Sequence, residues 1–381
     1  METLRPFSIE IPEAQLIDLR QRLAATRWPE AETVDDWSQG VPLAYLREFC
    51  SYWAQEYDWR VTERRLNVFP QFKSQIDGLD IHFLHVRSRH AQALPLLITH
   101  GWPGSIVEFH KVIAPLSDPT AFGGSADDAF HVICPSLPGY AFSDKPRQTG
   151  WGVEKIATVW DALMRRLGYQ RYVAQGGDWG AAVTTAIGTQ SLGACIGIHL
   201  NMPTASPTPQ ALSSPTERDQ RALAAAAHYQ QWEGGYSKQQ ATRPQTLGYG
   251  LVDSPVGQAA WILEKFRAWT DCQGHPENIL SRDELLDNIM LYWLTASAAS
   301  SARLYWESFG SFGGDRSAGV ELPTGCSIFP KEIVPTPRSW AEQRYRNIVY
   351  WNELDRGGHF AAFEQPQRFV EELRACFALM R

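Results

Sequence analysis

The run Gly176-Gly177-Asp178-Trp179-Gly180 places a carboxylate among three glycines. It follows a predicted strand, Arg171–Gln175, and precedes the helix-prone segment Ala181-Ala182-Val183. In a strand–turn–helix context, G-x-S-x-G is a nucleophile elbow, a strained turn that lifts the central side chain clear of a sheet. The pattern predicts Asp178 as a nucleophile. The alternative is an ordinary glycine-rich turn in which Asp178 is a helix N-cap.

An aspartate in place of serine changes the reactions that such an elbow can perform. Attack by a carboxylate on an ester or amide would give an anhydride, which is unfavourable. Attack on a saturated carbon that bears a leaving group gives an alkyl ester, and water can then hydrolyse this ester at its carbonyl carbon. Asp178 therefore favours displacement at sp³ carbon, with an epoxide or an alkyl halide as the expected substrate.

Regeneration of the nucleophile requires a base, and hydrolases with this elbow have the chain order nucleophile, acid, histidine. Gly357-Gly358-His359-Phe360 follows the predicted strand Ile348–Trp351. Of the ten histidines, His359 is the only one after the elbow that lies at a strand's carboxyl end in a glycine-rich loop. It is the expected base that activates water.

The acid that orients this histidine is expected after the preceding strand, Cys326–Phe329. Glu332 lies there, in Pro330-Lys331-Glu332, while Asp355 competes because it is close to His359 in sequence. Either carboxylate would fix the imidazole tautomer and stabilise the charged ring. The residues alone leave both open.

The elements around these residues alternate between strand, loop and helix from Leu94 onward. Apolar runs predict strands, with a helix at Val153–Leu167 between them; the runs are Leu94–Thr99, Phe130–Ser136, Arg171–Gln175, Cys195–Leu200, Cys326–Phe329 and Ile348–Trp351. This alternation predicts an α/β fold with a mostly parallel sheet that is covered on both faces by helices.

Two further regions flank or interrupt this pattern. Residues 1–90 indicate two helices, around residues 12–28 and 43–57, followed by a hairpin that turns at Asp77-Gly78. Residues 203–320 indicate a helical lid, with helices around Arg221–Trp232, Pro255–Trp269 and Glu284–Ala299. Four prolines mark its beginning (Pro203, Pro207, Pro209, Pro215) and three glycines its end (Gly310, Gly313, Gly314).

Composition excludes several classes of protein. The chain has 381 residues, 44% hydrophobic and 20% charged, with a net charge of −7. This balance argues against nucleic-acid and anionic-membrane partners. The six scattered cysteines and the absence of a signal peptide or a long apolar run favour a cytoplasmic protein. No cofactor or metal is expected, since the H-x-x-H pair His82 and His85 lies in a strand and faces opposite ways.

Several motifs together resemble the microsomal-type epoxide hydrolases of the α/β-hydrolase superfamily. They cover nearly the whole chain: Phe7–Trp28, His100-Gly101-Trp102-Pro103-Gly104-Ser105, Gly176–Gly180, Asp253–Gly257, Trp261–Phe266, Asn288–Trp293 and Gly357–Glu364. The resemblance implies an α/β-hydrolase fold with an N-terminal extension (residues 1–90), a core (91–202 and 321–381) and the inserted lid (203–320).

The resemblance also implies roles for particular residues. Asp178 matches the family nucleophile, His359 its base and Glu332 its acid, while Tyr236 and Tyr305 match the two lid tyrosines that donate to the epoxide oxygen. The backbone N–H groups of Trp102 and Trp179 would form the oxyanion hole. The implied partners are a small epoxide and water, a homo-oligomer is left open, and the apolar N-terminal anchor of membrane-bound members is not found in this sequence.

Two alternative functions are also compatible with an Asp elbow. A haloalkane-type dehalogenase shares the Asp elbow and the following tryptophan, but it would bind halide with N–H donors and would have no use for the tyrosine pair. A hydrolase-like binding protein would hold a ligand without turnover and predicts an incomplete set of catalytic groups.

Overall fold

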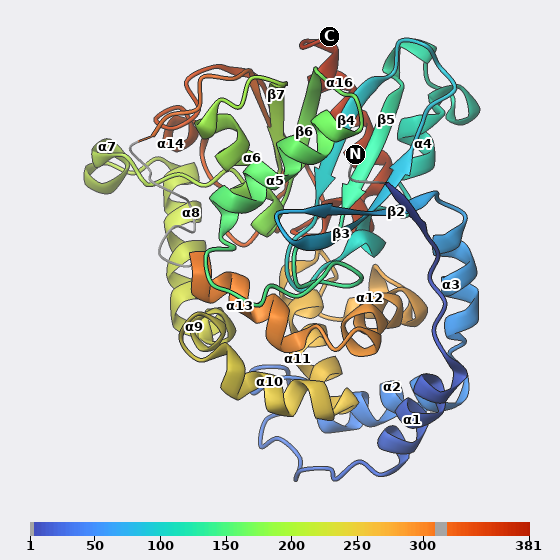
Figure 1. Ribbon diagram of the computed structural model, residues 1–381. Coiled ribbons are helices and arrows are strands. Elements are labelled where there is room, and N and C mark those ends of the chain that lie inside the picture. Colours follow the sequence, from blue (N-terminus) through green and yellow to red (C-terminus); the bar gives the residue numbers. More distant parts are fainter. Residues whose placement is uncertain (1–3, 309–317) are drawn as a thin grey trace.

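The computed structural model describes residues 4–308 and 318–381. Within these residues nine strands form one sheet, which occupies the upper half of the molecule in Figure 1. The strands are β1 (Arg5–Phe7), β2 (Gln71–Ile76), β3 (Leu79–Val86), β4 (Leu94–Thr99), β5 (Phe130–Pro135), β6 (Tyr172–Gly176), β7 (Cys195–Leu200), β8 (Thr324–Ile328) and β9 (Ile348–Glu353).

The strands lie in the order β1-β2-β3-β5-β4-β6-β7-β8-β9. The pairs β1–β2, β2–β3 and β3–β5 are antiparallel, and every pair from β5 to β9 is parallel. The central strands β4, β5 and β6 consist mainly of buried apolar residues, as expected where helices cover both faces of a sheet. The predicted α/β fold with a mostly parallel sheet is confirmed.

Helices account for most of the remaining chain. They are α1 (Glu13–Ala24), α2 (Leu43–Gln55), α3 (Trp59–Asn67), α4 (Ile113–Ser117), α5 (Val153–Arg166), α6 (Asp178–Gln190), α7 (Pro209–Ser213), α8 (Glu217–His228), α9 (Gly235–Thr242), α10 (Pro244–Asp253), α11 (Pro255–Trp269), α12 (Arg282–Leu294), α13 (Ala298–Ser308), α14 (Arg338–Ala341), α15 (Ala361–Glu364) and α16 (Pro366–Ala378). Helices α5 and α6 cover one face of the sheet, while α4 and α16 cover the other (Figure 1).

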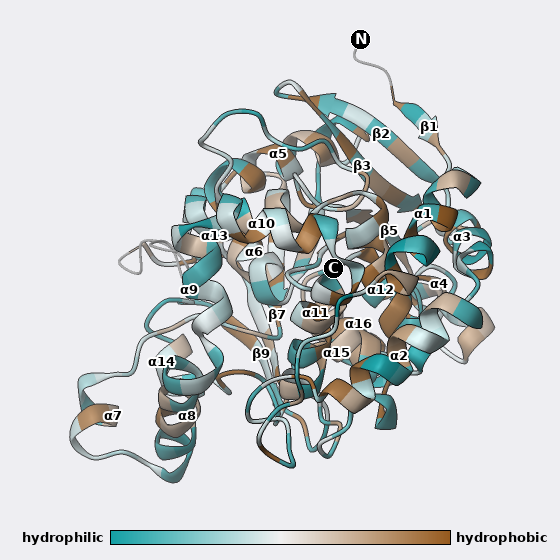
Figure 2. Ribbon diagram, turned by 90° about the horizontal axis from the view of Figure 1, so that it is seen from below, coloured by the Kyte–Doolittle hydropathy of each residue, from teal (hydrophilic) through white to brown (hydrophobic). Residues whose placement is uncertain are grey.

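Helices α7–α13 lie between β7 and β8 in the chain; α9–α13 form a layer below the sheet in Figure 1, and α7 and α8 lie to its left. The N-terminal helices α1 and α2 pack against α11, and α3 packs against α12. Polar contacts add to this packing: Arg65 of α3 pairs with the buried carboxyl of Asp287 in α12, and the hydroxyl of Tyr57, in the loop before α3, donates to Asp287 Oδ1 at 2.8 Å. Helices α7 and α8 project to one side of the molecule (Figure 2).

Some elements differ from the sequence-based expectations. Strand β1 and helix α3 were not predicted, because three residues carry no periodicity and α3 is largely charged. The single helix expected over Glu284–Ala299 is wrong: α12 ends at Leu294 and α13 begins at Ala298. Ala296 between them has a φ of 49°, which a right-handed helix does not allow.

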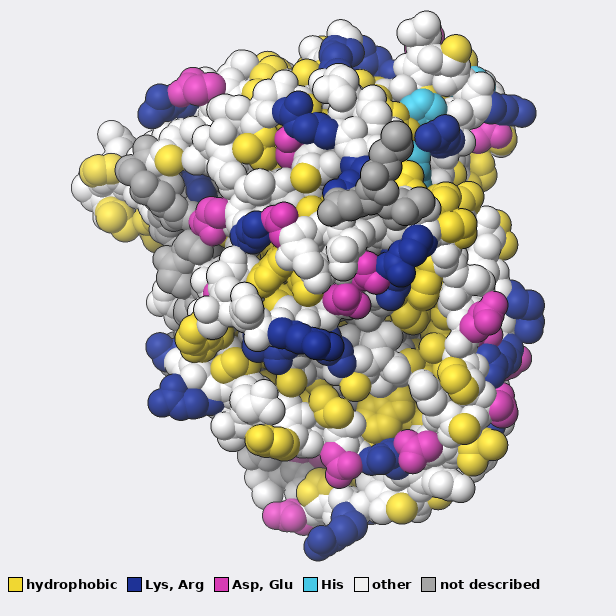
Figure 3. All heavy atoms as spheres, in the orientation of Figure 1, with side chains coloured by type: hydrophobic (Ala, Val, Ile, Leu, Met, Phe, Trp, Pro, Cys, Tyr) yellow, Lys and Arg dark blue, Asp and Glu magenta, His cyan; other side chains and the backbone are white. Residues whose placement is uncertain are grey.

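Four other features bear on the sequence-based expectations. The helix expected around Arg221–Trp232 ends at His228 and continues as a π-helix, Tyr229–Glu233. The three glycines expected at the end of the lid lie outside the described residues. All six cysteines are buried and free. None of the described helices has the length and apolar character needed to cross a bilayer. On the face of the molecule in Figure 3, basic and acidic side chains are mixed.

Candidate active site

Asp178 lies at the sharp turn between β6 and α6, at the carboxyl end of the sheet. Its φ is 50°, a left-handed conformation that is costly for a residue with a Cβ. The turn is tight: a Cβ at Gly176 would lie 2.0 Å from the carbonyl oxygen of Gly180, and one at Gly180 would lie 1.9 Å from that of Thr99. Glycine at both positions allows the backbones to approach closely enough to present Asp178.

The Asp178 carboxylate is held on two sides. The backbone N–H of Trp102, in the loop after β4, donates to Oδ1 at 2.8 Å. His359 Nε2 lies 3.3 Å from Oδ2. The Trp179 amide follows Asp178 directly at the first turn of α6, where backbone N–H groups are not used within the helix. One carboxylate oxygen therefore already has a backbone donor, and the other faces the imidazole.

His359 and Glu332 come from the loops that follow β9 and β8. His359 Nδ1 lies 2.6 Å from Glu332 Oε1, and both side chains are buried. The two loops are joined directly, since Lys331 N–H donates to the carbonyl oxygen of Gly357 at 3.0 Å. Asp355, the competing acid in the sequence, is exposed on the surface.

The surroundings of His359 determine its charge. Burial alone lowers the pKa of this imidazole, but the negative charges of Glu332 and Asp178 outweigh burial and raise its pKa well above the usual value for histidine. Esterification of Asp178 would remove one of these two charges. The pKa of His359 would then fall, which favours the neutral form that a general base needs.

Two buried tyrosines, one from α9 and one from α13, pack against each other edge to face. The rings of Tyr236 and Tyr305 are 5.8 Å apart between centroids, and both contact the ring of Trp102. Tyr305 also contacts Trp179 at 4.8 Å. Burial raises the pKa of both phenols well above 10, so both are proton donors at neutral pH.

A cavity of about 610 Å³ opens beside Asp178, large enough for a small organic molecule. Asp178, Tyr229, Tyr236 and Tyr305 lie on its wall together with apolar residues of α8 and of the loops after β7 and β8. The structure thus brings the predicted nucleophile and both predicted tyrosines to one cavity. The other predicted residues, His359, Glu332, Trp102 and Trp179, lie around the same carboxylate or the same phenols.

Helix α12 holds the Trp102 loop in place through contacts that no sequence argument predicted. Asn288 Nδ2 donates to the carbonyl oxygen of Pro103 at 2.7 Å, and Tyr292 OH donates to that of Gly104 at 2.7 Å. The Ser105 hydroxyl donates to Asn288 Oδ1, also at 2.7 Å. The signal was present in the segment Asn288–Trp293, although its spacing alone says nothing about which loop it contacts.

The His359 loop has supports of its own. His359 N–H donates to the carbonyl oxygen of Trp269 at 2.9 Å, and the Trp269 ring lies edge-on to the imidazole. Glu364 is buried beside this loop and accepts from Asp271 N–H at 2.9 Å, while Asp271 accepts from Gly357 N–H at 3.1 Å. Burial raises the pKa of Glu364 to about 7. These contacts fix the position of the imidazole relative to Asp178.

Two family models match the chain. The model described as "Epoxide hydrolase N terminus" matches residues 4–109, and the model described as "alpha/beta hydrolase fold" matches residues 95–250. Their matches cover the N-terminal helices, the Trp102 loop, the Asp178 turn and the first helices that follow β7.

Known proteins are similar over nearly the full length. A protein of Stigmatella aurantiaca with an epoxide hydrolase name is 58% identical over 379 residues, which is 99% of this chain and 86% of that protein. Epoxide hydrolase 1 of Sus scrofa is 37% identical over 406 residues, 100% of this chain and 89% of its own. The solved structure of Aspergillus niger epoxide hydrolase has a TM-score of 0.90 at 33% identity, covering 100% of this chain and 97% of that one.

Proposed function

This chain belongs to the epoxide hydrolase family, with an α/β-hydrolase fold, and on that premise we propose that it hydrolyses a small-molecule epoxide to a vicinal diol through a covalent ester on Asp178. The observation that carries the proposal is the meeting of Asp178, Tyr236 and Tyr305 on the wall of one cavity. A carboxylate beside two protonated phenols suits an electrophile whose leaving oxygen needs a proton.

The first step opens the ring. Asp178 Oδ2 attacks an epoxide carbon, the C–O bond of the ring breaks, and a phenol gives its proton to the departing oxygen. The Trp102 N–H holds Oδ1 at 2.8 Å, which leaves Oδ2 as the attacking atom. Tyr236 and Tyr305 are the proposed donors, because an alkoxide is a poor leaving group and both phenols keep their protons at neutral pH.

The second step releases the diol. His359 accepts a proton from a water molecule as the water oxygen attacks Asp178 Cγ, and Glu332 holds the imidazole in orientation at 2.6 Å and stabilises its charged form. Oδ1 becomes negative in the tetrahedral intermediate. The amides of Trp102 and Trp179 are the proposed oxyanion hole, and each such donor contributes about 3 kcal/mol to the stabilisation of this charge.

The division of the chain follows from the same proposal. Residues 203–320 act as the lid that carries Tyr236 and Tyr305, residues 1–90 are the N-terminal extension, and residues 91–202 with 321–381 are the hydrolase core. What supports this division is that α7–α13 lie between β7 and β8, and that α1–α3 pack against α11 and α12.

A test of the reaction compares two substrate classes with the purified protein. Styrene oxide is the epoxide probe, with diol formation followed by chromatography, and 1-chlorobutane and 1-bromobutane are the halide probes, with halide release followed in solution. We expect diol from the epoxide and no halide. Release of halide with styrene oxide untouched would establish a dehalogenase instead, and no turnover over a broad epoxide panel would favour the binding protein.

A further inference from the structure

A second, much smaller cavity also reaches Asp178. Its volume is about 20 Å³, which is enough for one water molecule. Of the described residues, Asp178 alone lines both this cavity and the large one. Among its other wall residues are His359, Glu108 and His100. A substrate in the large cavity and a water in the small one would therefore meet at Asp178.

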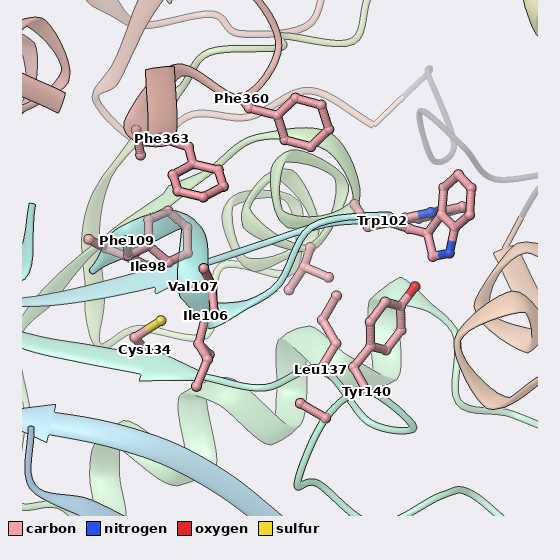
Figure 4. Packing of buried hydrophobic residues seen from close by; sticks show 14 of the residues in the cluster. Ile98, Trp102, Ile106, Val107, Phe109, Cys134, Leu137, Tyr140, Phe360 and Phe363 are labelled. Atoms are coloured by element: carbon pink, nitrogen blue, oxygen red, sulfur yellow. The ribbon is translucent and has the colours of Figure 1, made fainter. Parts of the chain in front are cut away.

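The Glu108 carboxyl is built closely into this wall. Glu108 belongs to the short helix Ile106–Phe109, whose apolar residues are part of the buried cluster that also contains Phe360 and Phe363 (Figure 4). A Cβ at Gly104 would lie 1.4 Å from Glu108 Oε1, so the glycine leaves the space that the carboxyl occupies. The carboxyl therefore packs directly against the loop that presents Trp102.

The Glu108 carboxyl can bind water as an uncharged acid, because its pKa is raised. Burial, which outweighs the opposing effect of His359, raises the pKa of Glu108 to about 8. At neutral pH the carboxyl is mostly protonated, so it offers one O–H donor and a carbonyl oxygen as acceptor. A neutral acid can orient water without placing another negative charge beside Asp178.

Most other polar groups on this wall have partners, although Gln175 Oε1 is buried without one among the described residues. His100 Nδ1 pairs with the carbonyl oxygen of Gly101 at 2.9 Å, and its Nε2 accepts from Leu137 N–H at 3.2 Å. Gln175 Nε2 donates to Asn201 Oδ1 at 2.7 Å. Burial lowers the pKa of His100 to about 4, so it is neutral as well. Glu108 and His359 remain as the titratable pair that can direct a water molecule toward Asp178, and Gln175 Oε1 can accept a hydrogen bond from the same water.

We propose that the small cavity is the site of the hydrolytic water and that Glu108 is a positioning residue, which orients this water together with His359. The inference rests on the proposed ester mechanism. The water oxygen bonds to Asp178 Cγ and one water proton passes to His359 Nε2. The Cγ–Oδ2 bond of the ester then breaks, and Oδ2 leaves with the substrate and takes that proton to complete the diol. Asp178 keeps the oxygen of the water, and its remaining proton restores the tyrosinate left by ring opening.

The test separates the two half-reactions in Glu108→Leu and Glu108→Gln. Rapid-quench single turnovers with styrene oxide give the rate of ester formation, and mass spectrometry of the intact protein follows the ester. In Glu108→Leu we expect unchanged ring opening and ester hydrolysis slowed by at least about tenfold, as for the loss of a buried hydrogen bond. Consequently kcat and KM fall together while kcat/KM is kept, and the ester accumulates.

Two further variants make the result specific. Glu108→Gln keeps a donor and an acceptor and should hydrolyse the ester within about threefold of the unaltered protein. Glu372→Gln, at a buried carboxyl of α16 that bonds Ser327, Tyr350 and Asn352 on β8 and β9, is the matched control and should change neither step. If Glu108→Leu does not fold, Glu108→Met removes the same polar atoms with a more adaptable side chain.

The outcomes are distinguishable. Equal slowing of both steps in Glu108→Leu, or normal hydrolysis in that variant, would overturn the role of Glu108 while leaving the ester mechanism intact. Loss of hydrolysis in Glu108→Gln equal to that in Glu108→Leu would also overturn it. If no variant, including the unaltered protein, forms an ester, the proposed function itself fails.

Discussion

Tyr236 and Tyr305 line the same cavity but have different surroundings. The hydroxyl of Tyr229 donates to that of Tyr236 at 3.1 Å, and the Lys265 ammonium lies 4.6 Å from the centre of the Tyr236 ring. Within the described part of the chain, the Tyr305 hydroxyl has no such donor, and its interaction with Tyr236 lowers the pKa of the Tyr236 phenol. A donor and a cation both stabilise a phenolate. Tyr236 is thus the better candidate for the phenol that transfers its proton.

This difference predicts unequal effects of removing the two hydroxyl groups. Tyr236→Phe should slow ring opening by about 100-fold and Tyr305→Phe by about 10-fold, since general acids and single donors contribute on that scale. The rate of ester formation in single turnovers is the measurement. Equal effects would mean that the phenols share the proton transfer. A smaller effect in Tyr236→Phe would assign the transfer to Tyr305.

The charges around His359 predict a pH dependence of ester hydrolysis. Burial lowers the pKa of His359 and Glu332 raises it, while the contribution of Asp178 is absent in the ester. The neutral base forms as pH rises, so hydrolysis should increase with pH up to a plateau. In Glu332→Gln the negative charge that raises the pKa of His359 is gone, so this pKa falls and the increase in hydrolysis rate occurs at lower pH. The maximal rate should also be lower, because the imidazole loses the carboxylate that orients it.

The measurement is the rate of ester decay after rapid mixing at a series of pH values. A rise that moves to higher pH in Glu332→Gln would contradict the assignment of Glu332. A profile that does not move would have the same consequence, because Glu332 would then exert no charge on the imidazole.

Individual site residues were predictable to different degrees. Asp178 and His359 stand out because local sequence places them at strand ends among glycines. Glu332 and Asp355 could not be separated by spacing, since the choice depends on which loop turns toward the imidazole. Glu108 could not be predicted, because its place in the site depends on the space left free at Gly104. Tyr229 could not be predicted either, because a π-helix brings its hydroxyl to that of Tyr236, seven residues further along the chain.

At the scale of elements, the turn between β6 and α6 leaves no room for a larger side chain at Gly176 or Gly180. Gly180→Ala would place a Cβ 1.9 Å from the Thr99 carbonyl oxygen, so β4 and α6 would have to separate. We expect loss of activity and destabilisation by about 3 kcal/mol or more, measured by urea unfolding. Gly250→Ala is the control: this glycine is exposed in α10, a Cβ there would meet nothing within 4 Å, and the variant should keep activity and gain up to about 1 kcal/mol.

Retention of full activity in Gly180→Ala would mean that the close approach of this turn to β4 is not needed to present Asp178.

The break between α12 and α13 shows what the sequence could not predict about elements. The sequence over Glu284–Ala299 is helical in character throughout, yet α12 ends at Leu294 and α13 begins at Ala298, with Ala296 between them at a φ of 49°. Such a break depends on tertiary contacts, which is why periodicity missed it.

At the scale of the whole molecule, the large cavity is enclosed by segments that are far apart in the chain. Helix α8 supplies one wall, the loops after β7 and β8 supply others, and Tyr305 of α13 closes the site near Asp178. The order of strands and helices was predictable from the alternation of apolar runs. How α7 and α8 fold back against the loops was not, because it depends on contacts between residues more than a hundred positions apart, such as that of Trp340 Nε1 with Asp219 Oδ1 at 2.7 Å.

The shape of the cavity predicts which substrates are affected by a change in its wall. Ala226 of α8 lines the cavity, and Ala226→Phe would fill part of its volume of about 610 Å³. We expect KM for styrene oxide to rise by about tenfold, with little change for propylene oxide, because overpacking acts on the larger ligand first. Ala224→Phe, on the exposed side of the same helix, is the matched control and should leave both substrates unaffected. Equal effects on the two epoxides would place the substrate elsewhere.

The central claim is that the substrate is bonded to Asp178 before water cleaves it. A single turnover in water enriched in heavy oxygen, followed by mass spectrometry of the peptide that contains Asp178, tests this directly. Because water attacks Cγ, the account predicts heavy oxygen in the Asp178 carboxylate and unlabelled diol in the first turnover, with the ester persisting in His359→Ala. Label in the diol, and none in the protein after repeated turnovers, would contradict it.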